Sequence, residues 1–169
     1  MSLEEIRVRG RYRRRVPAKT PIHTAFDRFG RGAGVELHRR AWYWRTEEVI
    51  VTCDLQKSQY GPSYYLNVGY YLRSTGDETH PRSSVCDIPL RAEQLVGDQS
   101  GLAELLDFEQ PIADEDRSVR LYALLADRLT PHIKRGATVE GLKQMLADGS
   151  LRTYMLGGNA QAVLLPRDD

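Results

Sequence analysis

The clearest alternation of apolar and polar residues in this chain lies between Val49 and Leu72. Two runs of period two flank the turn-like segment 59–62, and this pattern is typical of a β-hairpin. Placing Gln59 opposite Pro62 aligns the apolar residues of both strands on one face. The cross-strand pairs expected on that face are Leu55 with Leu66, Cys53 with Val68 and Val51 with Tyr70.

Strand patterns also occur on both sides of the hairpin. Residues 35–44 carry apolar side chains in period two that end with Trp42 and Trp44, which predicts a strand there. Pairing Trp44 with Val49 across a short loop places both tryptophans on the apolar face of the hairpin. After a long polar connection, residues 84–90 predict a fourth strand.

Helical patterns account for most of the remaining chain. Thr20 is a typical N-cap for a helix over 21–30. A longer helix is expected over 114–129, with an acidic first turn and with Pro131 ending or kinking it. Thr138 is expected to cap a further helix. The residues expected to form the buried stripe of the longer helix are Val119, Tyr122, Ala123, Ala126 and Leu129, and the stripe is widened by Leu121, Leu124 and Leu125.

These elements predict an α+β fold with a single antiparallel sheet of about four strands and helices packed on one face. The length of 169 residues suits one domain. We therefore divide the chain into a basic arm over residues 1–17 and a single domain over 18–169. No apolar run approaches the ~20 residues that span a bilayer, and no secretory signal is recognised, so a cytoplasmic location is expected.

Charge is distributed unevenly along the chain. Residues 1–40 contain eleven Lys or Arg against four acids, so the remainder is acidic. A dense basic run with an interleaved tyrosine suits the binding of nucleic-acid phosphates and the stacking of a base. A solvated arm that balances an acidic body also explains the same run, and we favour this interpretation because a short basic run is a signal of low specificity. The residues of this candidate arm are Arg11, Tyr12, Arg13, Arg14 and Arg15.

The second face of the hairpin carries the most concentrated polar chemistry. There Asp54 is expected opposite Asn67, from which it can accept an amide hydrogen bond, and Gln56 is expected to meet Tyr65. The alternative interpretation is an ordinary cross-strand ladder on a solvent face. The candidate binding residues are Asp54, Gln56, Lys57, Ser58, Tyr65 and Asn67.

Catalytic, metal-binding and cofactor-binding residues are not assigned. The four histidines have no pair at metal-ligand spacing, and Cys53 and Cys86 are expected to be small buried hydrophobes. Asp54 and Lys57 point to opposite faces of a strand, so an acid and a base do not converge there. These patterns count against an enzyme.

The run Leu55-Gln56-Lys57-Ser58, followed by Tyr60-Gly61 and a strand bearing Asn67, resembles an uncharacterised family of bacterial proteins that is known only as a domain of unknown function. The resemblance covers about residues 20–75 and includes Phe26 and the segment 42–44. It implies a compact α+β fold in the bacterial cytosol and no established activity.

The function is unknown at this point, and three hypotheses remain open. The first is a small non-catalytic interaction protein whose acidic body binds a basic protein, as an immunity protein that neutralises a toxin would. The second is nucleic-acid binding through the arginine-rich arm and the tyrosine-rich face. The third is an unrecognised enzyme with its site at Asp54, Gln56 and Asn67. A membrane partner is not expected, and the oligomeric state is not determined by the sequence.

Overall fold

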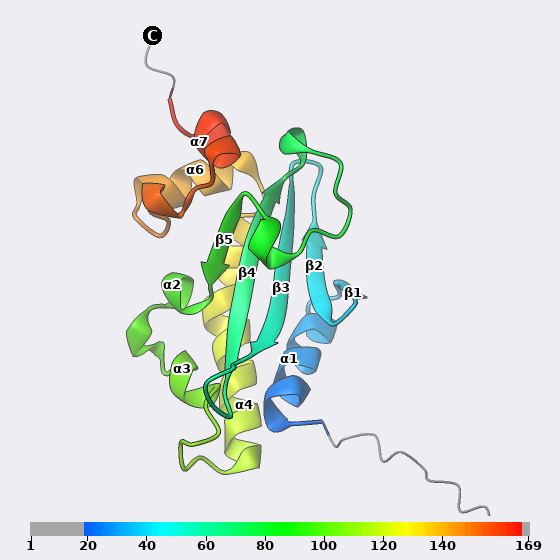
Figure 1. The fold of residues 1–169 in the computed structure, drawn as a ribbon, viewed down its shortest axis with the longest axis vertical. Coiled ribbons are helices and arrows are strands. Elements are labelled where there is room, and N and C mark those ends of the chain that lie inside the picture. Colours follow the sequence, from blue (N-terminus) through cyan, green and yellow to red (C-terminus); the bar gives the residue numbers. More distant parts are fainter. Residues whose placement is uncertain (1–18, 167–169) are drawn as a thin grey trace, which may run out of the picture.

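The computed structural model describes residues 19–166, so the predicted arm lies outside the described residues. Its centre is one antiparallel sheet in which every strand pairs with its neighbours along the sequence (Figure 1). The strands are β1 (Glu36–His38), β2 (Ala41–Arg45), β3 (Val49–Lys57), β4 (Tyr64–Leu72) and β5 (Ile88–Arg91), in the order β1-β2-β3-β4-β5.

The α+β class with a single antiparallel sheet is confirmed, but the sheet has five strands instead of about four. The strand predicted over 35–44 is two strands, because Arg39 and Arg40 adopt φ values of 46° and 70° and form a tight turn. His38 pairs with Ala41 across this turn. Positive φ at both central residues is the type I′ hairpin geometry, which Asn and Gly favour. Two arginines do not predict such a turn.

The central hairpin has the predicted register, with Leu55 opposite Leu66 and the other expected pairs in place. The pairing of β2 with β3 differs by two residues, since Trp44 lies opposite Val51 and not Val49. A shift of two residues preserves the face of every side chain. Both tryptophans therefore still pack with the main core.

The strand predicted over 84–90 is shorter than expected. A single 3₁₀ turn, η2 (Ser83–Val85), takes up the first part of that range, and β5 begins only at Ile88. Its residues pair with β4, with Ile88 opposite Tyr70 and Leu90 opposite Val68. The sheet therefore ends in a short edge strand.

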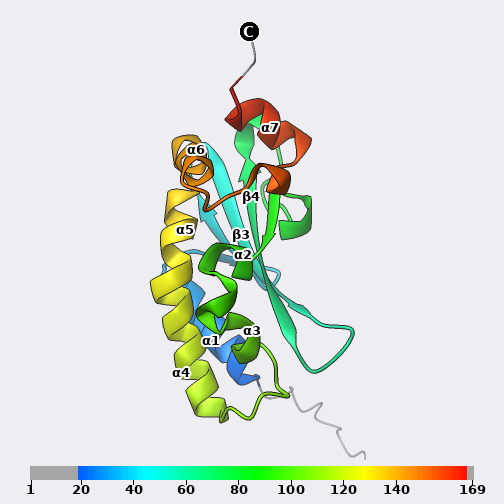
Figure 2. The same cartoon turned by 90° about the vertical axis from the view of Figure 1, so that its left-hand side faces the viewer.

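Helices cover one face of the sheet (Figure 2). The main core lies between this helical layer and the apolar face of the hairpin, and a smaller cluster lies on the opposite face. None of the helices within residues 19–166 combines the length and apolar character needed to cross a membrane. The α-helices are α1 (Pro21–Gly32), α2 (Glu93–Val96), α3 (Leu102–Leu105), α4 (Asp114–Leu124), α5 (Thr130–Arg135), α6 (Val139–Ala147) and α7 (Gly158–Leu164).

The helix caps follow the sequence signals. The Thr20 hydroxyl accepts a hydrogen bond from the backbone N–H of His23 at 3.2 Å, at the start of α1. The Thr138 hydroxyl accepts one from the backbone N–H of Gly141 at 3.0 Å, at the start of α6. Each cap satisfies a backbone donor that has no partner within its helix.

The longer helix continues past its predicted end to Arg135. A π-helical turn, η4 (Leu125–Leu129), connects α4 to α5, and Pro131 stands in the first turn of α5. The wider turn relieves the clash that a proline ring makes with the preceding helical turn. The predicted stripe was also wrong in part, because Val119 is 55% exposed. Burial of Leu121, Leu125 and Leu129 is as predicted, and Arg117 and Ile133 are buried in addition.

Arg117 is a buried arginine, only 1% exposed. Its guanidinium donates hydrogen bonds to the carbonyl oxygens of Leu105 at 2.8 Å and Asp107 at 2.7 Å. It also donates to those of Glu104 at 3.2 Å and Gln110 at 2.9 Å. The side chain therefore fastens the connection after α3 to the helix α4.

We expect Arg117→Met to lower the free energy of unfolding by about 3 kcal/mol or more, because buried carbonyl groups lose their charged donor. Urea denaturation followed by circular dichroism measures this change. Arg120→Met is the matched control, since Arg120 is exposed on the same helix; we expect a change within about 0.5 kcal/mol. Equal stability of the two variants would contradict the role of Arg117.

Candidate functional site

The segment 73–87, between β4 and β5, covers part of the second face of the hairpin (Figure 1). Thr52 is fully buried beneath it, and its hydroxyl donates to the Pro81 carbonyl at 3.1 Å. Gly69 permits the close approach, because a Cβ there would lie 2.9 Å from the Cα of Ser83. The room that this glycine leaves is thus filled by the chain itself.

Beyond this covered part, a groove stays open on the same face. It consists of two hollows of about 290 and 690 Å³ that share Gln56, Asn67, Ser83 and Ser84. Its walls come from the β1–β2 turn, the strands β3, β4 and β5, and the turn η2. We call these two hollows together the hairpin-face groove.

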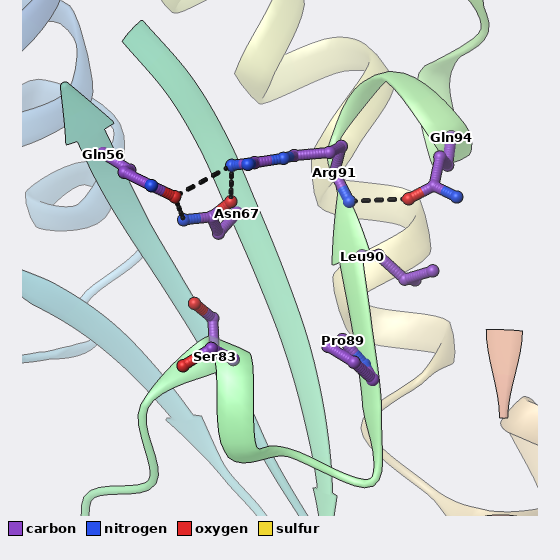
Figure 3. Close-up of a pocket in the computed structure, with 8 residues that line it drawn as sticks. Gln56, Asn67, Ser83, Pro89, Leu90, Arg91 and Gln94 are labelled. Carbon is purple, nitrogen blue, oxygen red and sulfur yellow. Dashed lines mark hydrogen bonds between the residues drawn. The ribbon is translucent and has the colours of Figure 1, made fainter. Parts of the chain in front are cut away.

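A hydrogen-bond network forms the floor of the hairpin-face groove (Figure 3). The Asn67 amide donates to Asp54 Oδ1 at 2.8 Å and to Gln56 Oε1 at 3.3 Å. The Arg91 guanidinium donates to the same Gln56 oxygen at 3.1 Å and to the Asn67 side-chain oxygen. The Ser83 hydroxyl donates to the second oxygen of Asp54. The network links four separate elements of the chain.

Four of the six predicted binding residues lie together at this network. Asp54 and Asn67 make the expected hydrogen bond. Gln56 lies opposite Tyr65 as expected, but its side-chain oxygen accepts hydrogen bonds from Asn67 and Arg91. The Tyr65 ring instead lies beneath the Arg91 guanidinium, whose central carbon is 4.2 Å from the ring centroid.

The other two predicted residues lie apart from the groove. Lys57 pairs with Tyr64 and follows the parity of the apolar face, at the end of β3. Ser58 is 8% exposed, and its hydroxyl accepts a hydrogen bond from the backbone N–H of Tyr60 within the hairpin turn. The candidate arm residues 11–15 lie outside the described residues.

The groove is lined by cations that the sequence did not predict. Arg39, Arg40, Arg82 and Arg91 all line it, and Asp54 is the single carboxylate among the lining residues. These arginines come from the β1–β2 turn, the segment 73–87 and β5, so no spacing in the sequence links them. The groove is therefore strongly cationic, a property that favours an anionic ligand.

A second group that the sequence did not predict lies at the β1 end of the groove. Glu36, His38 and His80 present side-chain ligand atoms that all lie within 4.8 Å of one another. His80 is far from the other two along the chain, and only the path of segment 73–87 brings it to β1. These residue types suit a metal ion such as Zn²⁺.

The close packing at Gly69 can be tested through a thiol. Cys86 belongs to the segment 73–87 and is only 6% exposed, with its side chain against Gly69. Burial raises the pKa of its thiol to about 12, so the thiol is unreactive while the segment stays in place. We expect Gly69→Ala, whose new Cβ would lie 2.6 Å from Cys86 Sγ, to lower the unfolding free energy by about 1–3 kcal/mol. We also expect faster reaction of one thiol per chain with a disulfide reagent under native conditions.

Gly61→Ala is the control, because Gly61 lies in the turn of the same hairpin and a Cβ there meets nothing within 4 Å. The cysteine thiols of the Gly61→Ala variant should react at the same rate as those of the unmodified protein. Cys53 is fully buried and should stay protected in every variant. Unchanged thiol reactivity in Gly69→Ala would show that the segment is not held by this contact.

The chain matches one known protein family over most of its length. The sequence profile of the family described as Domain of unknown function (DUF4304) matches residues 31–135. That range contains all five strands and continues through α5, so it reaches well past the resemblance over 20–75. No curated protein and no solved structure matches the chain. Because the profile covers more than half of the chain and every residue of the hairpin-face groove, the protein belongs to the DUF4304 family.

Proposed function

We propose that this protein is a non-catalytic binding protein whose hairpin-face groove holds single-stranded nucleic acid. The supporting observation is the set of four groove arginines against one carboxylate. That carboxylate, on Asp54, already accepts hydrogen bonds from Asn67 and Ser83. Arginine presents a planar fork of donors that matches a phosphate, so this arrangement favours a phosphate backbone.

The β1–β2 turn adds weight to this proposal. Arg39 and Arg40 are both exposed and both adopt positive φ, a conformation that carries a steric cost for residues other than glycine. Asn followed by Gly is the usual solution for such a turn. Here the turn instead has two arginines, which place two cations at the rim of the groove. Local backbone strain of this kind is often found at functional sites.

The floor of the groove suits a single strand with accessible bases. Gln56 and Gln94 line it with side-chain amide groups, which are of the type that pair with base edges. The rings of His38 and His80, stacked at 3.9 Å between centroids, add a flat aromatic surface at the other end. Hydrogen bonding of Asp54 to its neighbours favours recognition over acid–base chemistry.

The basic arm supports the same function by its composition. Its run of arginines with one tyrosine would add a sequence-independent attraction for phosphates. We place the activity in the bacterial cytosol, on the resemblance of residues 20–75 to bacterial proteins. The Leu-Gln-Lys-Ser motif at residues 55–58 carries that resemblance.

Replacing both turn arginines tests the proposal without harming the fold. Arg39→Asn combined with Arg40→Gly removes two cations and supplies the residues that the turn geometry prefers, so stability should be unchanged or raised. We expect affinity for a short single-stranded RNA to fall at least tenfold at low salt. The slope of log affinity against log salt should decrease by about two. Fluorescence anisotropy at several salt concentrations measures both quantities.

The matched control is Arg120→Gln with Lys143→Gln, which removes the same charge from exposed positions on α4 and α6. We expect this pair to change RNA affinity by less than twofold. A chain lacking residues 1–17 separates the arm from the groove. If arm deletion abolishes binding while the turn variant binds normally, the groove is not the nucleic-acid site.

Recognition of a basic protein is the second candidate function. Exposed acids gather where the connection held by Arg117 meets the start of α4, among them Glu104, Glu109 and Glu115. An immunity-type protein would use such an acidic surface to bind a basic toxin. Absence of RNA binding by the full chain at low salt would make this the leading candidate.

A further inference from the structure

Glu36, His38 and His80 form a compact cluster at the β1 edge of the sheet. The Nε2 atom of His80 lies 2.6 Å from Oε1 of Glu36. The His38 ring stacks on the His80 ring, with 3.9 Å between centroids and 23° between planes. One ligand atom from each of the three residues lies within 4.8 Å of the other two. Two imidazoles and a carboxylate thus face one small volume.

The residues around the cluster orient its ligand atoms. The Thr79 hydroxyl lies 3.3 Å from Nδ1 of His80, which leaves Nε2 directed toward Glu36. Arg45 donates from Nε to Oε2 of Glu36 at 2.7 Å and also to the Thr79 carbonyl oxygen. Protein metal sites commonly hold the outer atoms of their ligands in this way. Arg45 therefore holds Glu36 and the backbone next to His80 in place.

We propose that Glu36, His38 and His80 bind a divalent transition-metal ion of the Zn²⁺ type. A set of two imidazole nitrogens and one carboxylate oxygen is a common choice for such ions, and three protein ligands leave a coordination position for water or a ligand. This inference goes beyond the proposed function, because it requires no nucleic acid.

The carboxylate of Glu36 is ready for this role. Its Oε1 atom faces the histidine, while Oε2 is held by Arg45. A ligating carboxylate in proteins often shows the same division between metal and outer partner.

Metal binding requires one local rearrangement. The lone pairs of the two stacked rings lie in two nearly parallel planes, so one imidazole must rotate about its Cβ–Cγ bond to share an ion with the other. This torsion is broad for histidine, and both side chains are only partly buried. The site also lies at the end of the hairpin-face groove, since His38 and His80 both line it.

Titration of the tag-free full chain with ZnCl₂ by isothermal calorimetry tests the proposal, and Co²⁺ absorption reports the ligand set. We expect one metal ion per chain. His38→Gln and His80→Gln should each weaken binding at least tenfold. Glu36→Gln keeps the shape of the side chain and removes its charge, and it should weaken binding to a similar extent. His132→Gln, on α5, is the control and should bind like the unmodified protein.

Circular dichroism melting of each variant separates loss of metal ligands from loss of fold. Absence of metal binding by the unmodified chain overturns the proposal, as does full binding by the His38→Gln and His80→Gln variants. Equal weakening in the His132→Gln control also overturns it. Because no RNA is present, a negative result leaves nucleic-acid binding by the groove unaffected.

Discussion

The antiparallel pairing of β3 with β4 is the constraint on which the rest of this structure depends. Side chains alternate between the two faces of a strand, so a single register decides which residues are buried and which stay available. One face of this hairpin supplies the apolar surface that α1, α4 and α5 cover. The other face aligns Asp54 with Asn67 and Gln56 with Tyr65. The core and the candidate site are therefore two results of the same pairing.

The segment 73–87 converts the second face from a flat surface into a groove. It is held at two places: in its middle Thr52 donates to the Pro81 carbonyl, and where its two ends meet the Asp87 carboxylate accepts from the Leu72 backbone N–H at 2.7 Å. Gly69 allows its backbone to approach the sheet. The same path carries His80 to Glu36, so this one segment assembles both the groove wall and the proposed metal cluster.

The lining of the hairpin-face groove carries more positive than negative side chains. The carboxylate of Asp54 is occupied by neighbouring donors, whereas the arginines at the β1–β2 turn remain exposed at the rim. Their positive φ values carry a local cost within a turn that other residues would form more easily. The nucleic-acid binding that we propose would give these cations a functional use that offsets that cost. Membership of the DUF4304 family extends over all the groove residues but assigns them no activity.

The sequence by itself determined the α+β class, the register of the central hairpin and the caps of α1 and α6, because these depend on periodicity and on contacts between residues close in the chain. Only the tertiary structure decided the rest. The hydropathy of arginine predicts an exposed side chain, yet Arg117 is buried. Four carbonyl groups from another segment accept hydrogen bonds from its guanidinium. The groove arginines, and Glu36 with His80, come from segments far apart in sequence, and no local pattern records which distant residues a folded chain brings together.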